Sequence, residues 1–198
     1  MPGIKEVQLY LTGLWLLMRH DQRGFRYLDL TERGALRSFW SVVFSAPAIA
    51  ISWIWLRQSY LHSMPEGSGT GPLYFFRLAL IEGLNWIVPL VLAGILAWAI
   101  GIGARYSAIV ATVNWLTLPF SYLYALLILV LLLAPGLAGF VALLWLFLLL
   151  ALIGVYMRVI QMICDGHLLT GAAMTLVLLI PTMLLSDVVE RFLGVYPG

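Results

Sequence analysis

Long uncharged apolar runs occupy most of this chain between Ser38 and Leu185. The longest of them, Gly83 to Ile102, carries no charge over twenty residues. A helix rises about 1.5 Å per residue, so roughly 20 residues cross the hydrocarbon core of a bilayer, which is about 30 Å thick. This run therefore predicts a membrane-spanning helix, and its repetition along the chain predicts a protein that crosses the membrane several times.

The composition agrees with this prediction. Apolar residues make up 63% of the chain and charged residues 10%, whereas soluble domains have about 45–50% and 25%. Six of the eleven basic residues precede the first apolar run, where acidic residues are interleaved with them. They do not form the folded basic surface that nucleic-acid binding requires, so we expect no nucleic-acid partner.

The predicted fold class is all-α, a bundle of about five membrane spans preceded by an amphipathic helix. The spans are expected at Ser38–Leu56, Leu78–Ile102, Ser107–Leu133, Phe140–Met157 and Leu168–Leu185. The chain then divides into an interfacial segment (1–37), the bundle (38–185) and a short polar tail (186–198). Two alternatives stay open: four spans if the last segment is re-entrant, and six if Pro119 breaks the third span into two crossings. The glycine- and proline-rich stretch from Met64 to Pro72 is expected to be a solvent loop.

The amino-terminal segment from Lys5 to His20 predicts a helix that lies in the membrane interface. Three apolar side chains are expected to enter the acyl boundary, and three arginines to meet anionic headgroups; these are Leu11, Leu14, Trp15, Arg19, Arg23 and Arg26. The alternative is that the apolar face of this helix packs on the bundle itself.

The distribution of basic residues predicts the orientation. With the amino terminus inside, the inner side holds the six amino-terminal bases together with Arg105 and Arg158, and the outer side holds Arg57, Arg77 and Arg191. Since cytoplasmic loops carry the excess of Lys and Arg, the amino terminus is predicted to be cytoplasmic. The expected location is a bacterial inner membrane, with the carboxyl terminus on the opposite side.

Polar residues inside the second and third spans are the strongest candidates for a site. They are Glu82, Asn85, Asn114, Thr117 and Ser121. The last three occupy positions i, i+3 and i+7 of one helix and therefore share a face. Ionised groups are costly in hydrocarbon, so this stripe and Glu82 are expected to face protein or water. Either they line a path that binds a polar ligand or proton, or they hold helices together by hydrogen bonds.

Small residues recur at four-residue intervals on the second span, at Ala93, Ala97 and Gly101. Such residues allow helix backbones to approach closely, so they predict a packing face, within the bundle or in a dimer.

Catalytic motifs are missing from the sequence: it contains no H-E-x-x-H, G-x-S-x-G, Walker lysine loop or C-x-x-C. We therefore expect no enzymatic activity, no cofactor and no metal. The predicted function is a non-enzymatic integral membrane protein that organises or scaffolds membrane partners, including copies of itself, through helix packing. The alternative is a small transporter or channel subunit with an intramembrane polar path.

The layout resembles that of the Yip1-type membrane proteins. The residues that carry the resemblance are Asp29-Leu30 with Gly34 just before the first span, and Arg105-Tyr106-Ser107 opening the span that contains Pro119. The resemblance covers about residues 25 to 185. It implies five closely spaced spans with short loops behind a polar or amphipathic amino-terminal segment.

Overall fold

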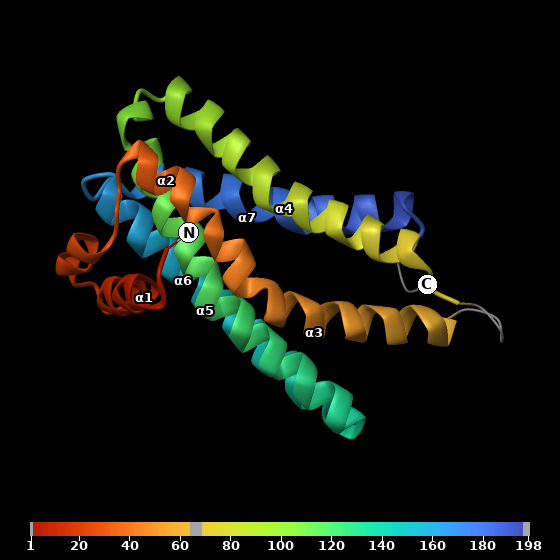
Figure 1. The fold of residues 1–198 in the computed structure, drawn as a ribbon. Coiled ribbons are helices and arrows are strands. Elements are labelled where there is room, and N and C mark those ends of the chain that lie inside the picture. Colours follow the sequence, from red (N-terminus) through yellow and green to blue (C-terminus); the bar gives the residue numbers. More distant parts are fainter. Residues whose placement is uncertain (1, 64–68, 196–198) are drawn as a thin grey trace.

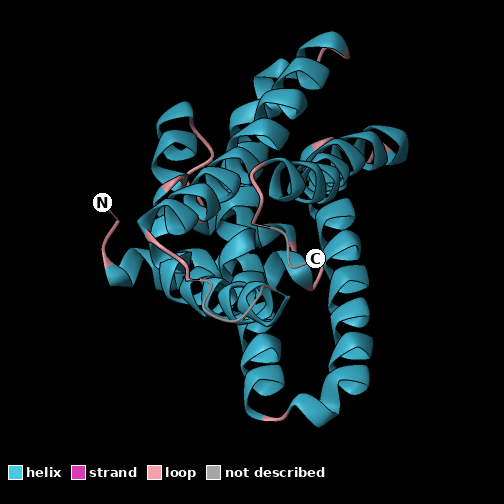
Figure 2. Cartoon of the chain, turned by 90° about the vertical axis from the view of Figure 1, so that its right-hand side faces the viewer, coloured by secondary structure: helices cyan, strands magenta, loops and turns pink. Residues whose placement is uncertain are grey.

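The computed structural model describes residues 2–63 and 69–195, and their regular structure is entirely helical (Figures 1 and 2). The elements in chain order are α1 (Ile4–Met18), η1 (Gln22–Tyr27), α2 (Glu32–Ser38), α3 (Trp40–Ser63), α4 (Pro72–Ala99), η2 (Gly103–Arg105), α5 (Tyr106–Leu133), η3 (Pro135–Leu137), α6 (Ala138–Ile163) and α7 (Leu168–Phe192). The all-α prediction is confirmed. Residues 64–68 of the predicted solvent loop lie outside the described residues.

Five helices of the described chain are long and apolar enough to cross a bilayer, as the sequence predicts. They are longer than expected at several ends. Helix α3 continues to Ser63 and α7 to Phe192, so part of the predicted polar tail is helical. Helix α4 begins at Pro72, where the fixed backbone angle of proline suits a first helical position.

Pro119 does not divide the third span. Helix α5 runs without interruption over 28 residues with this proline inside it. A proline removes one backbone hydrogen bond, and the packed neighbours of a membrane helix hold the helix together across the gap. Helix α5 has such neighbours, because α1, α2, α3 and α6 all pack against it. Each of the five predicted spans thus corresponds to one continuous helix.

Helices α3 and α4 follow one another in the chain but pack on different partners. Helix α3 lies along α5, whereas α4 lies along α7, and α6 joins α5 to α7 (Figure 1). Aromatic contacts connect α3 and α4 near the loop between them, where the rings of Tyr60 and Tyr74 have centroids 5.1 Å apart. Farther from that loop the two helices border a groove.

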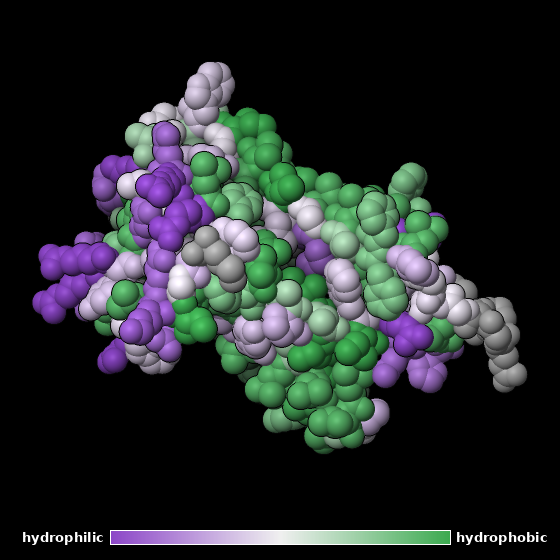
Figure 3. All heavy atoms as spheres, in the orientation of Figure 1, coloured by the Kyte–Doolittle hydropathy of each residue, from purple (hydrophilic) through white to green (hydrophobic). Residues whose placement is uncertain are grey.

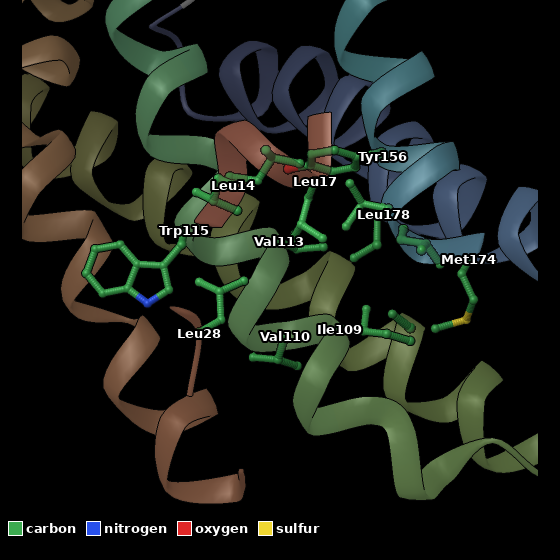
Figure 4. Packing of buried hydrophobic residues seen from close by; sticks show 14 of the residues in the cluster. Leu14, Leu17, Leu28, Ile109, Val110, Val113, Trp115, Tyr156, Met174 and Leu178 are labelled. Carbon is green, nitrogen blue, oxygen red and sulfur yellow. The ribbon is translucent and has the colours of Figure 1, made fainter. Parts of the chain in front are cut away.

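Helix α1 packs against the bundle. Its buried face includes Leu14 and Leu17, both 0% exposed, and the Tyr10 ring lies 4.8 Å from that of Trp115 on α5 (Figure 4). The prediction that Leu14 faces lipid is therefore wrong. Because α5 presents an apolar surface beside α1, Leu14 makes close van der Waals contacts with protein side chains in place of lipid tails, and such packing is what holds helices together in a membrane. Trp15 points the other way and is 58% exposed.

The remaining residues of the predicted lipid-facing set divide between these two environments. Leu11 is half-buried against the same core, and Arg19, Arg23 and Arg26 are exposed. Figure 3 shows hydrophilic residues gathered at the end of the molecule where α1 and α2 lie, and an apolar surface over the bundle.

Candidate intramembrane binding site

Glu82 lies deeper along its helix than the sequence suggests. Helix α4 begins at Pro72, ten residues earlier, so Glu82 is roughly 15 Å along the helix axis from its first turn. The side chain is half-buried. Three cavities, of about 500, 230 and 310 Å³, have both Glu82 and Trp86 in their linings. Glu82 therefore lies in the wall that the three cavities share. Among the described residues it is the one charged side chain that lines them.

The largest of the three hollows that Glu82 lines is an apolar groove between α3 and α4. On α3 its wall includes Ala46, Ala50 and Trp53, and on α4 it includes Ala79 and Gly83. The small residues on both helices leave the space between them open. In Figure 3 a hydrophilic patch lies recessed between these helices within an apolar surface. Trp53 and Glu82 line this groove together.

The two smaller cavities are more polar and lie within the bundle. The first is bounded by α3, α4, α5 and α6, and the second by α4, α5, α6 and α7. Their polar lining residues are Ser45, Ser52, Glu82, Asn85, Asn114, Thr117, Ser121, Tyr124, Tyr156 and Thr182. All five polar residues predicted from the sequence thus line a hollow that contains Glu82.

Several of these polar residues also join helices. Asn114 donates from Nδ2 to the Ser38 hydroxyl over 2.8 Å, and the Ser121 hydroxyl lies 3.3 Å from that of Ser45. Each such bond contributes about 0.6 kcal/mol on average in a membrane bundle. The same side chains therefore both line a cavity and hydrogen-bond neighbouring helices.

Most hydroxyl groups of the two polar cavities have their protons committed to protein acceptors, and among the described residues Ser45 and Tyr124 are the exceptions. Four of them donate to a backbone carbonyl of their own helix, namely Ser52, Thr117, Ser121 and Thr182. Because Thr117 donates to Val113, the 3.2 Å contact between Thr117 and Tyr156 must use the Tyr156 proton. These walls therefore present mainly oxygen lone pairs to the cavity.

Asn85 adds a further acceptor next to Glu82. Its Nδ2 donates to the Ser186 hydroxyl on α7 over 2.8 Å. Its Oδ1 is buried and accepts no hydrogen bond from the described residues. Since an unpaired buried acceptor is costly, this oxygen favours a ligand that donates hydrogen bonds. Together with the Glu82 carboxyl group, this oxygen makes the site suited to bind a proton or a cation that carries N–H groups.

Sequence reasoning missed the polar residues that α3, α6 and α7 contribute. Ser45 and Ser52 are seven residues apart and share a helix face, and Thr182 and Ser186 are four apart. That spacing is the signal that could have found them. Tyr156 has no polar neighbour at helical spacing that would have marked it; its place is set by the packing of α6 on α5.

The small-residue face of α4 is used within the bundle. Ala93 and Ala97 are both 0% exposed and belong to the main hydrophobic core. Gly101 does not share this face, so its prediction as a packing residue is wrong. It follows the end of α4 with a φ of 77°, and the bonds from Ile102 N–H to the Ala97 carbonyl and from Gly101 N–H to the Trp98 carbonyl form a Schellman motif.

Ion pairs fasten the amino-terminal end of the molecule. Arg37 on α2 donates to both carboxylate oxygens of Glu6 on α1, at 2.7 and 2.8 Å. The Tyr10 hydroxyl also donates to Glu6, and this bond with the nearby Arg37 holds the pKa of the Glu6 carboxyl below its usual value. Burial and the bond to Glu6 raise the pKa of Tyr10 to about 12.

A second pair joins two turns at the same end. Arg105, before α5, pairs with Asp165 in the turn between α6 and α7, and also donates to the Ile163 carbonyl over 2.8 Å. The hydrogen bond from Arg105 lowers the pKa of Asp165. Asp165 has a φ of 54°, in the left-handed region that non-glycine residues seldom adopt. The pair and the turn geometry together define how α5 begins beside the end of α6.

Comparison with protein-family models, with curated proteins and with solved structures found no match for this chain.

Proposed function

We propose that this integral membrane protein is a small transporter in which Glu82 binds a proton or a hydrogen-bond-donating cation within the membrane. The observation that carries the proposal is the meeting of three cavities at Glu82 and Trp86. A carboxyl group within a membrane span is costly unless it faces protein or water, and such residues mark ion and proton pathways.

The linings of the cavities favour a positive or proton-donating ligand. Most hydroxyl protons on the walls are donated to protein acceptors, and Asn85 Oδ1 accepts no hydrogen bond from the described residues. An anion would meet oxygen lone pairs and a carboxylate, which repel it. A proton or an ammonium group would be bound by the same atoms.

The scaffolding function remains a prediction with less support from the geometry. The small-residue face that suggested an intermolecular contact has two of its three members buried inside this chain. A polar cavity that four helices surround has no role in scaffolding. The Yip1-type resemblance is likewise a proposal, and it concerns the layout of the spans rather than the chemistry at Glu82.

The direct test is proton flux into liposomes containing the purified protein and an entrapped pH-sensitive dye, driven by an imposed membrane potential. The wild-type protein should conduct protons, and Glu82→Gln should reduce the flux to that of protein-free liposomes, because the amide cannot exchange a proton. Glu32→Gln is the matched control, since Glu32 is exposed on α2. A wild-type protein without proton flux, or equal flux in Glu82→Gln, would overturn proton exchange at Glu82 as the basis of transport.

A further inference from the structure

The groove between α3 and α4 is open to the surface. At its inner wall it has a charged side chain, that of Glu82. Its lining has one charged residue, Glu82, and is otherwise formed by apolar and aromatic side chains, including Trp53 and Trp86. The groove of about 500 Å³ is within the range of small-molecule sites. The polar cavities begin at its inner wall, because Glu82 and Trp86 belong to all three hollows.

We infer that this groove is the lateral opening through which a long-chain amine enters from the bilayer, with its ammonium group at Glu82 and its alkyl chain between α3 and α4. The inference rests on the proposed function and names the class of substrate. A water-soluble cation would have to cross apolar walls to reach Glu82 by this route, whereas an amphiphile already resides in the membrane.

Charge complementarity selects the head group. No ion pair among the described residues includes Glu82, so a primary ammonium would supply the counter-charge. One further acceptor belongs to the adjoining cavity that Glu82 also lines: Asn85 Oδ1, which is buried and accepts no hydrogen bond from the described residues. A neutral alcohol of the same chain length donates one hydrogen bond to the carboxylate but supplies no counter-charge, and a fatty acid would be repelled by it.

The small residues that line the groove leave room for the alkyl chain of the amine. Ala46 and Ala50 on α3 face the groove from one side, and Ala79 and Gly83 on α4 from the other. A Cβ built at Gly83 meets no atom within 4 Å. Larger residues at these positions would fill the space, so a side chain at Gly83 can obstruct the groove without displacing the α4 backbone.

The test is photolabelling of the purified protein in lipid nanodiscs with a long-chain primary alkylamine that carries a diazirine on its chain. The matched alcohol is the second probe, and labelled residues are mapped by mass spectrometry. The amine should label α3 and α4 along the groove, at least about tenfold more than the alcohol, which corresponds to about 1.4 kcal/mol. Glu82→Gln should remove this preference for the amine while labelling by the alcohol continues.

Gly83→Leu should abolish groove labelling by both probes. The control is Gly154→Leu on α6, where an added Cβ also meets nothing within 4 Å, and it should label as the wild type does. Equal labelling by amine and alcohol would show a groove filled by ordinary lipid tails, and labelling unchanged by Gly83→Leu would place the probe elsewhere; either result overturns the inference. Cross-linking of the groove to a second copy of the chain instead of the probe would also overturn it.

The two proposals fail in different ways. Proton flux that depends on Glu82, with no preference for the amine in the groove, would leave the proposed function standing and remove the lateral route. Amine labelling that depends on Glu82, without proton flux, would leave an amine site in a protein that is no proton transporter.

Discussion

At the scale of single residues, the contrast between Glu82 and Glu6 shows how environment divides one residue type into two roles. Glu6 is held by Arg37 and Tyr10 at the surface of the bundle. Glu82 faces a cavity between membrane helices, with Trp53 and Trp86 beside it. The paired carboxylate contributes to structure, and the one at the cavity is the candidate for binding.

The Glu6–Arg37 pair should make the docking of α1 depend on pH. Since the folded pKa of Glu6 is lowered, its stabilising contribution is present above the usual carboxyl pKa of 4.5 and is lost as pH falls through the folded value. Hydrogen-exchange protection of α1 amides should decrease over that range. The partly exposed pair contributes at most about 1 kcal/mol.

Glu6→Gln should weaken the protection of α1 already at neutral pH and remove its dependence on acid. Lys5→Gln is the control, because Lys5 is the exposed neighbour of Glu6 on the same helix. An α1 whose protection is the same in Glu6→Gln as in the wild type would show that apolar contacts alone hold the helix.

At the scale of helices, the connection from α1 to η1 depends on two glycines in contact. A Cβ added at Gly24 would lie 2.3 Å from the Gly13 carbonyl oxygen, and one added at Gly13 would lie 2.7 Å from the Gly24 carbonyl oxygen. The sequence carried no signal for this, because the two glycines are eleven residues apart and their contact arises only when η1 folds back on α1.

Gly24→Ala should therefore separate η1 from α1 and destabilise the protein by roughly 1–3 kcal/mol, as overpacking does in other cores. A lower unfolding temperature of the detergent-purified protein would report it. Gly139→Ala on α6 is the matched control, since its added Cβ meets no atom within 4 Å. Equal unfolding temperatures for both variants would contradict the close approach.

Apolar periodicity and length were sufficient to predict the five spans, because in lipid a long uncharged run has few alternatives to a helix. They did not predict which face of α1 is buried. The helix is apolar over a broad arc, and lipid and protein are both favourable surroundings for leucine, so Leu14 and Trp15 looked equivalent in the sequence. Packing on α5 distinguishes them, and the polar cavities likewise depend on four helices meeting, which spacing within single helices does not reveal.

At the scale of the whole molecule, the exposure of Trp15 predicts that the docked α1 still contacts the bilayer. In a variant that keeps only Trp15 among the tryptophans, brominated lipids should quench its fluorescence strongly. A variant that keeps only Trp115, which is 3% exposed in the core, should be quenched little. Equal quenching would mean that α1 leaves the bundle in the membrane, and no quenching of Trp15 would place it in water.

The positions of the charges bear on how the bundle is oriented. The ion pair of Arg105 with Asp165, and the hydrogen bond from the Ser107 hydroxyl to the Leu30 carbonyl at 3.0 Å, place the start of α5 and the turn after α6 beside the amino-terminal segment. The bases predicted for the inner side are thus at one end of the fold. Arg57, Arg77 and Arg191 lie toward the other end of their helices.

Replacing Arg19, Arg23 and Arg26 with glutamine should weaken the preference for a cytoplasmic amino terminus, because each base near an anionic leaflet contributes about 1 kcal/mol. The three side chains are exposed, so the substitution removes charge and leaves the core unchanged. Reporter fusions to both termini, expressed in a bacterium, would measure the fraction of each orientation.

The matched control removes the same number of charges from the opposite end, at Arg57, Arg77 and Arg191, and should leave the amino terminus inside. Equal distributions in both variants would show that the amino-terminal bases do not set the orientation, and termini on the same side would contradict five crossings.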